Sequence, residues 1–209
     1  LADAVRTVRK RGQFMQEAVP VGEGAMAAVM GLDDEKIIAI CQEVEAAGGV
    51  VQAVNFNCPG QVVIAGSAQS VAQASEALKA AGAKRAMLLP VSAPFHSTLM
   101  QPAAVRLKEV LDSIDVQDAK IPVVANVTAQ KVIKAQEIKE LLVQQAAKPV
   151  RWVECVQTME QAGTKVFVEV GPGKVLSGLS KKIAKNIDVL NVEDIASLQK
   201  TLDYFKGGI

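Results

Sequence analysis

The spacing of apolar and polar positions changes several times along the chain, and each change predicts a new element. Residues 1–18 place apolar side chains every three or four positions among basic ones, which predicts a helix that ends near Val19. Since helical periodicity begins at the first residue, we expect further sequence to precede Leu1 in the complete protein.

Residues 21–92 alternate strand and helix patterns in the order βαββαβ. The expected strands cover 25–30, 50–56, 61–65 and 85–91, and the expected helices begin at Asp33 and at Ser67 or Ser70 and end at Gly48 and Gly82. The four residues Asn57 to Gly60 are expected to join the second and third strands as a hairpin. This order is typical of a ferredoxin-like unit, whose two helices cover one face of an antiparallel sheet.

After Ser92 the pattern changes to helices that alternate with buried strands. The expected helices cover 97–113, 136–147, 152–161 and 174–184, with a last one through Ile195 and Phe205, and the expected strands cover 121–127 and 165–170. Such alternation predicts a parallel sheet. We therefore predict an α/β protein in which residues 1–20 and 93–209 form a partial larger subdomain and residues 21–92 form a smaller one inserted into it.

Charge and composition exclude several classes of function. Lys and Arg number 23 against 22 Asp and Glu, and aromatic residues make up only 3% of the chain, so neither an overall positive field nor stacking platforms are available for nucleic acid. Two stretches without charge, 46–75 and 86–105, are interrupted by prolines and polar residues and are not expected to span a membrane.

The cysteine and histidine content argues against a structural metal site. Cys41, Cys58 and Cys155 are far apart, and His96 is the only histidine, so a zinc site is not expected. An odd, sparse set of cysteines and no recognisable secretory leader favour a reducing compartment, and we expect the protein in the cytoplasm.

Two side chains are candidates for chemistry. His96 follows a predicted strand and precedes a helix, where loops present catalytic groups, although a lone histidine can also be a buried or helix-capping residue. Arg11 shares a helix face with Met15, and its guanidinium could bind a carboxylate, although composition alone favours a solvated member of the basic run at 9–11.

Other motifs are weaker. The amides of Asn55 and Asn57 could bind a ligand or simply satisfy a turn, and a Cys58–His96 nucleophile pair lacks an electropositive setting. The turn at 171–173 suggests an anion site, but Leu176 stands where a dinucleotide fingerprint requires glycine. No Gly-x-Ser-x-Gly elbow occurs, so either the reaction is not serine-based acyl transfer or the nucleophile lies upstream.

Taken together, several stretches resemble the malonyl-CoA:acyl carrier protein transacylase family of bacterial fatty acid synthesis. The similarity runs from Leu1 to the last predicted helix. The stretches that carry it are Arg11–Gln16, Gly24–Met26, Asn55–Gly66, the loop Val91–Ser97 and Val168–Leu176. The resemblance implies an α/β-hydrolase-like large subdomain that carries a ferredoxin-like small one.

The resemblance also implies a reaction and the residues that perform it. In the family a serine takes malonyl from coenzyme A, a histidine acts as its base, and the phosphopantetheine thiol of acyl carrier protein attacks the acyl-serine. His96 matches the histidine and Arg11 the arginine that binds the malonate carboxylate. Gln145 stands where a backbone carbonyl orients the histidine, and Phe95 resembles a bulky residue of malonyl-selective members. The expected substrate-binding residues are Arg11, Met15, Phe95 and Asn57.

The sequence departs from the family because the serine elbow and the N-terminal glutamine loop that helps form the oxyanion hole are absent. We therefore expect these 209 residues alone to be inactive and prone to association. Their expected partners are malonyl-CoA, acyl carrier protein and an N-terminal segment of the same protein, with no metal and no cofactor. Lys181, Lys182 and Lys185 could dock the carrier protein or form a solvated face.

Two other hypotheses stay open at this point. The chain could come from the acyltransferase domain of a polyketide synthase or from a malonate decarboxylase. It could also be a non-catalytic module whose ferredoxin-like unit binds a small effector or a partner.

Overall fold

The computed structural model describes residues 1–207, and the chain divides into two compact units, Leu1–Trp152 and Val153–Ile209. Helices and strands alternate through both units, so the α/β class predicted from the sequence is confirmed. The boundary at residue 152 separates two groups of residues that make most of their contacts within their own group. The predicted division into 21–92 and a body of 1–20 with 93–209 stays a prediction.

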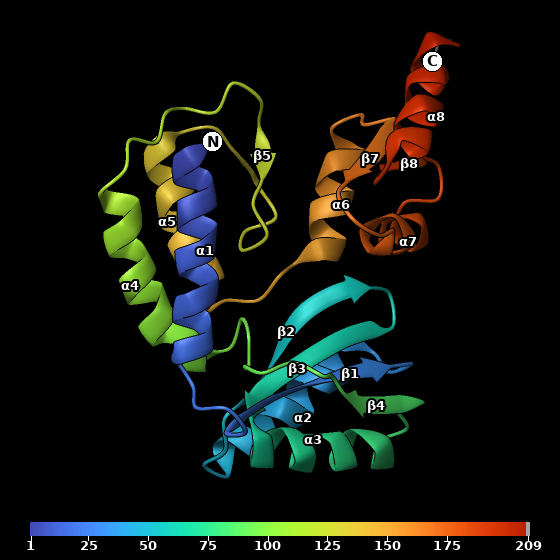
Figure 1. The fold of residues 1–209 in the computed structure, drawn as a ribbon. Helices are drawn as coiled ribbons and strands as arrows, with labels where there is room; N and C mark the ends of the chain where they lie inside the picture. The colour runs from blue at the N-terminus through green and yellow to red at the C-terminus, as the bar shows by residue number, and fades with distance from the viewer. Residues whose placement is uncertain (208–209) are drawn as a thin grey trace. The chain divides into compact units, whose positions relative to one another are not determined.

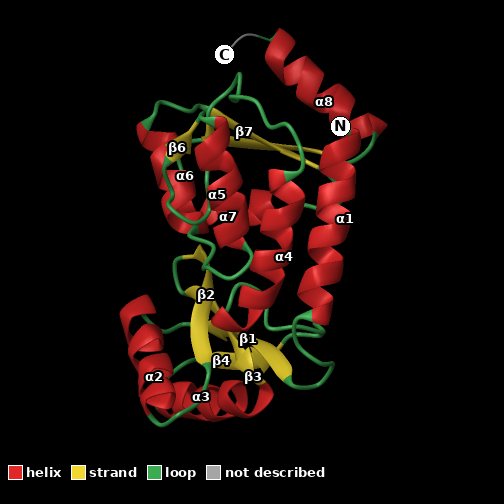
Figure 2. Ribbon diagram, turned by 90° about the vertical axis from the view of Figure 1, so that its left-hand side faces the viewer, coloured by secondary structure: helices red, strands yellow, loops and turns green. Residues whose placement is uncertain are grey.

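The centre of the first unit is a four-stranded antiparallel sheet with two helices on one face (Figures 1 and 2). Its elements are β1 (Gly24–Met30), α2 (Asp34–Ala46), β2 (Val51–Cys58), β3 (Gln61–Ser67), α3 (Ala68–Ala80) and β4 (Arg85–Leu88). The strand order is β2-β3-β1-β4. The element order βαββαβ agrees with the prediction, and Asp33 and Ser67 are the N-caps of the two helices.

The two faces of this sheet have different surroundings because side chains alternate along each strand. One face packs under α2 and α3 in a core that includes Ala27, Val29, Val62 and Ile64. The opposite face forms a smaller apolar cluster with Met26, Ala28, Val54, Val63 and Ala65, against which Leu89 and Phe95 pack. This second face is the one that positions the candidate site.

Three helices of the first unit share another core. They are α1 (Ala2–Glu17), α4 (Gln101–Asp112) and α5 (Ala135–Gln145), and a short 3₁₀ helix, η1 (Thr98–Met100), precedes α4. Their buried cluster includes Met15, Met100, Leu107, Ala146 and, from the loop after β4, the fully buried Ala93. The helix predicted at 97–113 is thus divided in two, with Pro102 in the first turn of α4, where its missing N–H costs nothing.

Two local predictions were wrong. Of the strand expected at 121–127, only β5 (Val123–Val124) forms, antiparallel to β6 (Lys131–Val132), and Ile121 is 77% exposed. An apolar run becomes a buried strand only where a neighbour supplies ladder partners, and among the described residues only β6 does so. The hairpin between β2 and β3 has two linking residues rather than four, because Pro59 and Gly60, with φ of 73° at the glycine, suffice for the turn.

The second unit consists of α6 (Trp152–Gln161), β7 (Val166–Val170), α7 (Val175–Ile183), β8 (Asp188–Val192) and α8 (Ile195–Lys206), the first of which begins at the unit boundary. β7 and β8 are parallel and are connected through α7, as the predicted α/β pattern requires. The sequence reading missed β8, whose polar residues Asp188 and Asn191 obscure the strand pattern.

Candidate active site

A cavity of about 480 Å³ lies in the first unit on the sheet face that α2 and α3 leave open. Its walls come from α1, from the sheet and from the segment after β4. The lining residues are Arg11, Gly12, Met15, Met26, Asn55, Asn57, Val63, Leu89, Val91, Phe95 and His96. Five of the six residues predicted for the site therefore line one cavity. The sixth, Gln145, does not line it, but its backbone carbonyl is hydrogen-bonded to His96.

Irregular pairing in β2 directs two amides toward this cavity. The register between β2 and β3 shifts between Ala53 and Asn55 and again between Phe56 and Cys58. The first shift pairs Asn55 with Val63, whose side chain also lines the cavity. Since directly paired residues of an antiparallel ladder lie on the same face, the bulges bring both asparagines into the site.

The loop that carries His96 is held close to the sheet. Pro94 is buried against Gly24 at the start of β1, so closely that a Cβ on that glycine would lie 2.3 Å from the proline Cδ. His96 itself adopts a left-handed backbone conformation with φ of 64°. Left-handed backbone is uncommon outside glycine and is found where the surrounding structure enforces it.

The imidazole of His96 has a defined protonation pattern. Its Nδ1 lies 2.8 Å from the carbonyl oxygen of Gln145 at the end of α5. A carbonyl can only accept, so Nδ1 donates its hydrogen and Nε2 of the neutral ring keeps its lone pair. Burial and, to a smaller extent, the charge of Arg11 lower the pKa of His96 below its ordinary 6.5, while its hydrogen bonds to the Gln145 and Lys148 backbone oppose this. Near neutral pH the ring is therefore a base.

Arg11 projects from α1 into the same cavity. Burial lowers its pKa, and within the described residues its guanidinium has neither a hydrogen bond nor an ion pair. Arginine is effectively always protonated in proteins, so this is a partly buried cation without a counter-ion. Such a group favours an anionic ligand, above all a carboxylate that can accept two hydrogen bonds from the guanidinium.

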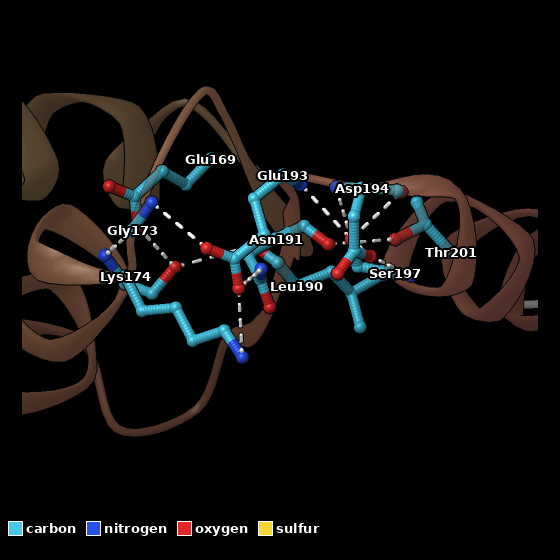
Figure 3. A network of polar contacts seen from close by, with 10 residues as sticks. Glu169, Gly173, Lys174, Leu190, Asn191, Glu193, Asp194, Ser197 and Thr201 are labelled. Atoms are coloured by element: carbon cyan, nitrogen blue, oxygen red, sulfur yellow. Dashed lines mark hydrogen bonds and ion pairs between the residues drawn. The ribbon is translucent and has the colours of Figure 1, made fainter.

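The weaker motifs of the sequence lie elsewhere. Cys58 is buried and does not line the cavity. At the turn 171–173 of the second unit, Gly173 N–H donates to Glu193, and the first turn of α7 donates to Glu169 (Figure 3). The chain's own carboxylates thus occupy the amides that an external anion would need.

The described residues contain no group of three or more His, Cys, Asp or Glu side chains placed to hold a metal ion. Within the same residues, every helix is too short or too polar to cross a bilayer.

Sequence reasoning did not place Asn55, Met26, Val63, Leu89 or Val91 in the site. The four apolar residues among these have no feature in the sequence that distinguishes them from other sheet and loop residues. Asn55 had a polar signal, since two asparagines flank Phe56, but only the bulges decide which face each amide occupies.

The acyl transferase domain model matches residues 1–205. The chain belongs to the acyl transferase domain family. The chain is 50% identical over 204 residues to the malonyl CoA-acyl carrier protein transacylase of Bacillus subtilis, and it is 48% identical over 202 residues to that of Escherichia coli K12. It spans 64% and 65% of the length of these relatives, with 98% and 97% of its own residues aligned.

Solved structures of acyl transferases also match. An acyl-carrier-protein S-malonyltransferase from Burkholderia pseudomallei superposes with a TM-score of 0.92 at 53% identity, covering 96% of this chain and 65% of that one. A malonyl-transacylase in complex with a type II polyketide synthase acyl carrier protein gives 0.93 at 48% identity, with the same coverage.

Proposed function

We propose that this chain carries the base and the acyl-selecting residues of an enzyme that moves a malonyl group from coenzyme A to the phosphopantetheine thiol of an acyl carrier protein. The observation that carries the proposal is the cavity in which a neutral imidazole and an unpaired guanidinium lie together. The names of relatives about 50% identical to the chain support the choice of reaction.

His96 is the general base. Its Nε2 takes the proton of a hydroxyl group as the hydroxyl oxygen bonds to the thioester carbonyl carbon; the C–S bond then breaks, and the departing coenzyme A sulfur takes that proton. In the second half-reaction Nε2 accepts the proton of the carrier thiol, whose sulfur attacks the malonyl ester, and then returns it to the hydroxyl oxygen. The carbonyl of Gln145 keeps the ring in the tautomer that this role needs.

Arg11 selects the acyl group. The free carboxylate of malonyl would accept two hydrogen bonds from the guanidinium, which an acetyl group cannot do. With acetyl bound, the partly buried guanidinium stays unpaired, so binding loses the charge-assisted bonds and retains the desolvation cost.

The remaining predicted residues shape the space around the acyl chain. Phe95 lies beside the base and would crowd a branched acyl group, while Met15, 3% exposed, supplies a flexible apolar wall next to Arg11. Asn57 and its neighbour Asn55 offer amides to the polar parts of the thioester.

The nucleophile is proposed to come from outside the described residues. Neither serine nor cysteine lines the cavity among these residues, and the 209 residues contain no Gly-x-Ser-x-Gly. We expect the purified 209-residue chain to remain unlabelled after incubation with radiolabelled malonyl-CoA. A stoichiometric covalent adduct would refute this part of the proposal.

The fold that fits this function is an inserted ferredoxin-like unit at 21–92 and a partial α/β-hydrolase-like body at 1–20 and 93–209. The strand order β2-β3-β1-β4, with both helices on one face, supports the first part. The parallel pair β7–β8 supports the second.

The decisive experiment changes Arg11 in the full-length protein. Arg11→Ala should reduce malonyl transfer relative to acetyl transfer about 10- to 100-fold, the effect of losing charge-assisted hydrogen bonds. Arg11→Lys should restore only part of this preference because a lysine lacks the planar fork. Arg9→Ala, on the exposed side of the same helix, is the matched control. Unchanged selectivity in Arg11→Ala would refute the proposal, and transfer that survives loss of both His96 and Arg11 would favour a non-catalytic module.

A second candidate concerns the acceptor. The match to a malonyl-transacylase bound to a polyketide synthase carrier protein makes such a carrier a reasonable alternative to that of fatty acid synthesis. Comparison of kcat/KM for the two types of carrier protein would decide between them.

A further inference from the structure

His96 occupies the third position of a tight turn formed by Pro94–Ser97. The Ser97 N–H donates to the carbonyl of Pro94 at 3.4 Å, which closes the turn, and the φ of 64° at His96 falls where turns of this kind prefer glycine or asparagine. A residue other than glycine in this region is strained. Contacts around the turn must therefore hold it in place.

The Ser97 side chain makes the shorter bond to the same carbonyl. Its Oγ donates to the Pro94 oxygen at 2.7 Å, and the residue is fully buried, with 0% exposure. Because Ser97 is buried, its hydroxyl cannot bond to water instead. Opening the turn would leave this hydroxyl without a partner, which is costly, so the bond favours the closed turn. The backbone bond alone, at 3.4 Å, is long for an N–H···O contact.

Two further anchors fix the segment after the turn. The backbone N–H of Thr98 donates to the Oε1 of Gln52 on β2 at 2.8 Å, and Met100 N–H donates to the Ser97 carbonyl to begin η1. These bonds position the start of η1 relative to the sheet. These two bonds do not set the backbone of His96, which lies inside the turn. Within residues 1–207, the two bonds between Pro94 and Ser97 close that turn.

We propose that Ser97 is a positioning residue, whose hydroxyl keeps the Pro94–Ser97 turn closed and His96 in its left-handed conformation so that Nδ1 meets the Gln145 carbonyl. This local role does not depend on any reaction. Its consequence for acyl transfer rests on the proposed function.

The test reads the tautomer of His96 by NMR of protein labelled with ¹⁵N-histidine. The His96 signal is assigned by its disappearance in His96→Gln. In the wild type, at a pH where the ring is neutral, we expect well-separated Nδ1 and Nε2 shifts that indicate hydrogen on Nδ1. In Ser97→Ala the separation should shrink as the Gln145 bond is lost in part of the population. Shifts identical to wild type would overturn the proposal.

The matched control is Ser75→Ala. Ser75 is also buried, and its hydroxyl also donates to a backbone carbonyl at 2.7 Å, that of Val71, but it lies in α3 and not in the turn that carries His96. This variant should lose comparable stability and leave the His96 tautomer unchanged. If it shifts the tautomer as much as Ser97→Ala does, the effect is general destabilisation and the proposal fails.

A second variant keeps the test decisive if Ser97→Ala does not fold. Ser97→Cys retains a side chain of similar shape with a weaker donor and should give an intermediate tautomer ratio; an unchanged ratio overturns the proposal. In transfer assays of the full-length protein, Ser97→Ala should lower kcat about tenfold with little change in KM for malonyl-CoA. If the full-length wild type shows no transfer while Ser97→Ala still shifts the His96 tautomer, the proposed function is refuted and the positioning role stays intact.

Discussion

Replacing Gly24 with alanine should destabilise the first unit through the loop that carries His96. The new Cβ would lie 2.3 Å from Cδ and 2.6 Å from Cγ of Pro94. These atoms belong to a ring that is fixed to the backbone and buried, so they cannot rotate away. Either β1 or the loop must move, and overpacking of this kind costs roughly 1–3 kcal/mol. For a protein of this size that corresponds to a Tm lower by about 2 to 12 °C.

Urea unfolding followed by circular dichroism measures the loss of stability, and the ¹⁵N shifts of His96 report whether the loop moves with it. Gly12→Ala is the control, because a Cβ there meets nothing within 4 Å and Gly12 lies inside α1. Alanine should stabilise that helix by about 0.5–1 kcal/mol. If the free energy of unfolding of Gly24→Ala lies within about 0.5 kcal/mol of the wild-type value, the close approach of Pro94 does not constrain the loop.

Three further predictions follow from charge. Burial and Arg11 lower the pKa of His96, so between pH 6.5 and the lowered pKa the unfolded state binds more protons than the folded state, and both the stability due to His96 and the transfer rate should fall as the pH drops through this range. In Arg11→Gln the acid limb of the pH–rate profile should move to higher pH, because a positive charge near His96 is removed. An unmoved limb would contradict the electrostatic coupling between Arg11 and His96. The double change Lys181→Glu and Lys182→Glu, at exposed positions of α7, should raise KM for the carrier protein and spare that for malonyl-CoA, whereas equal effects would exclude docking there. Glu169→Gln should speed amide hydrogen exchange in the first turn of α7, since the pKa of this carboxyl is lowered by hydrogen bonds from that turn; exchange at the wild-type rate would show that the cap is dispensable.

The candidate site was partly predictable because its chemistry lies in uncommon residues. A single histidine after a strand and an arginine on the same helix face as Met15 were visible as candidates, and the structure brings both to one cavity. The tautomer of His96 was not visible, since its hydrogen-bond partner is a backbone carbonyl 49 residues away, and a backbone oxygen carries no signal in the side-chain pattern.

The sequence by itself determined the elements whose cause is local. The helical period predicted α1 and α6, Asp33 marked the start of α2, Ser67 and Ser70 were the two candidate starts of α3, and the strand and helix patterns predicted the order βαββαβ. These features depend on neighbours a few positions apart. Only the tertiary structure decided which segments gained a ladder partner. β8 pairs with β7, whereas most of 121–127 forms no ladder. The tertiary structure also decided the bulges that direct Asn55 and Asn57 to the cavity, because pairing and burial depend on residues distant in sequence.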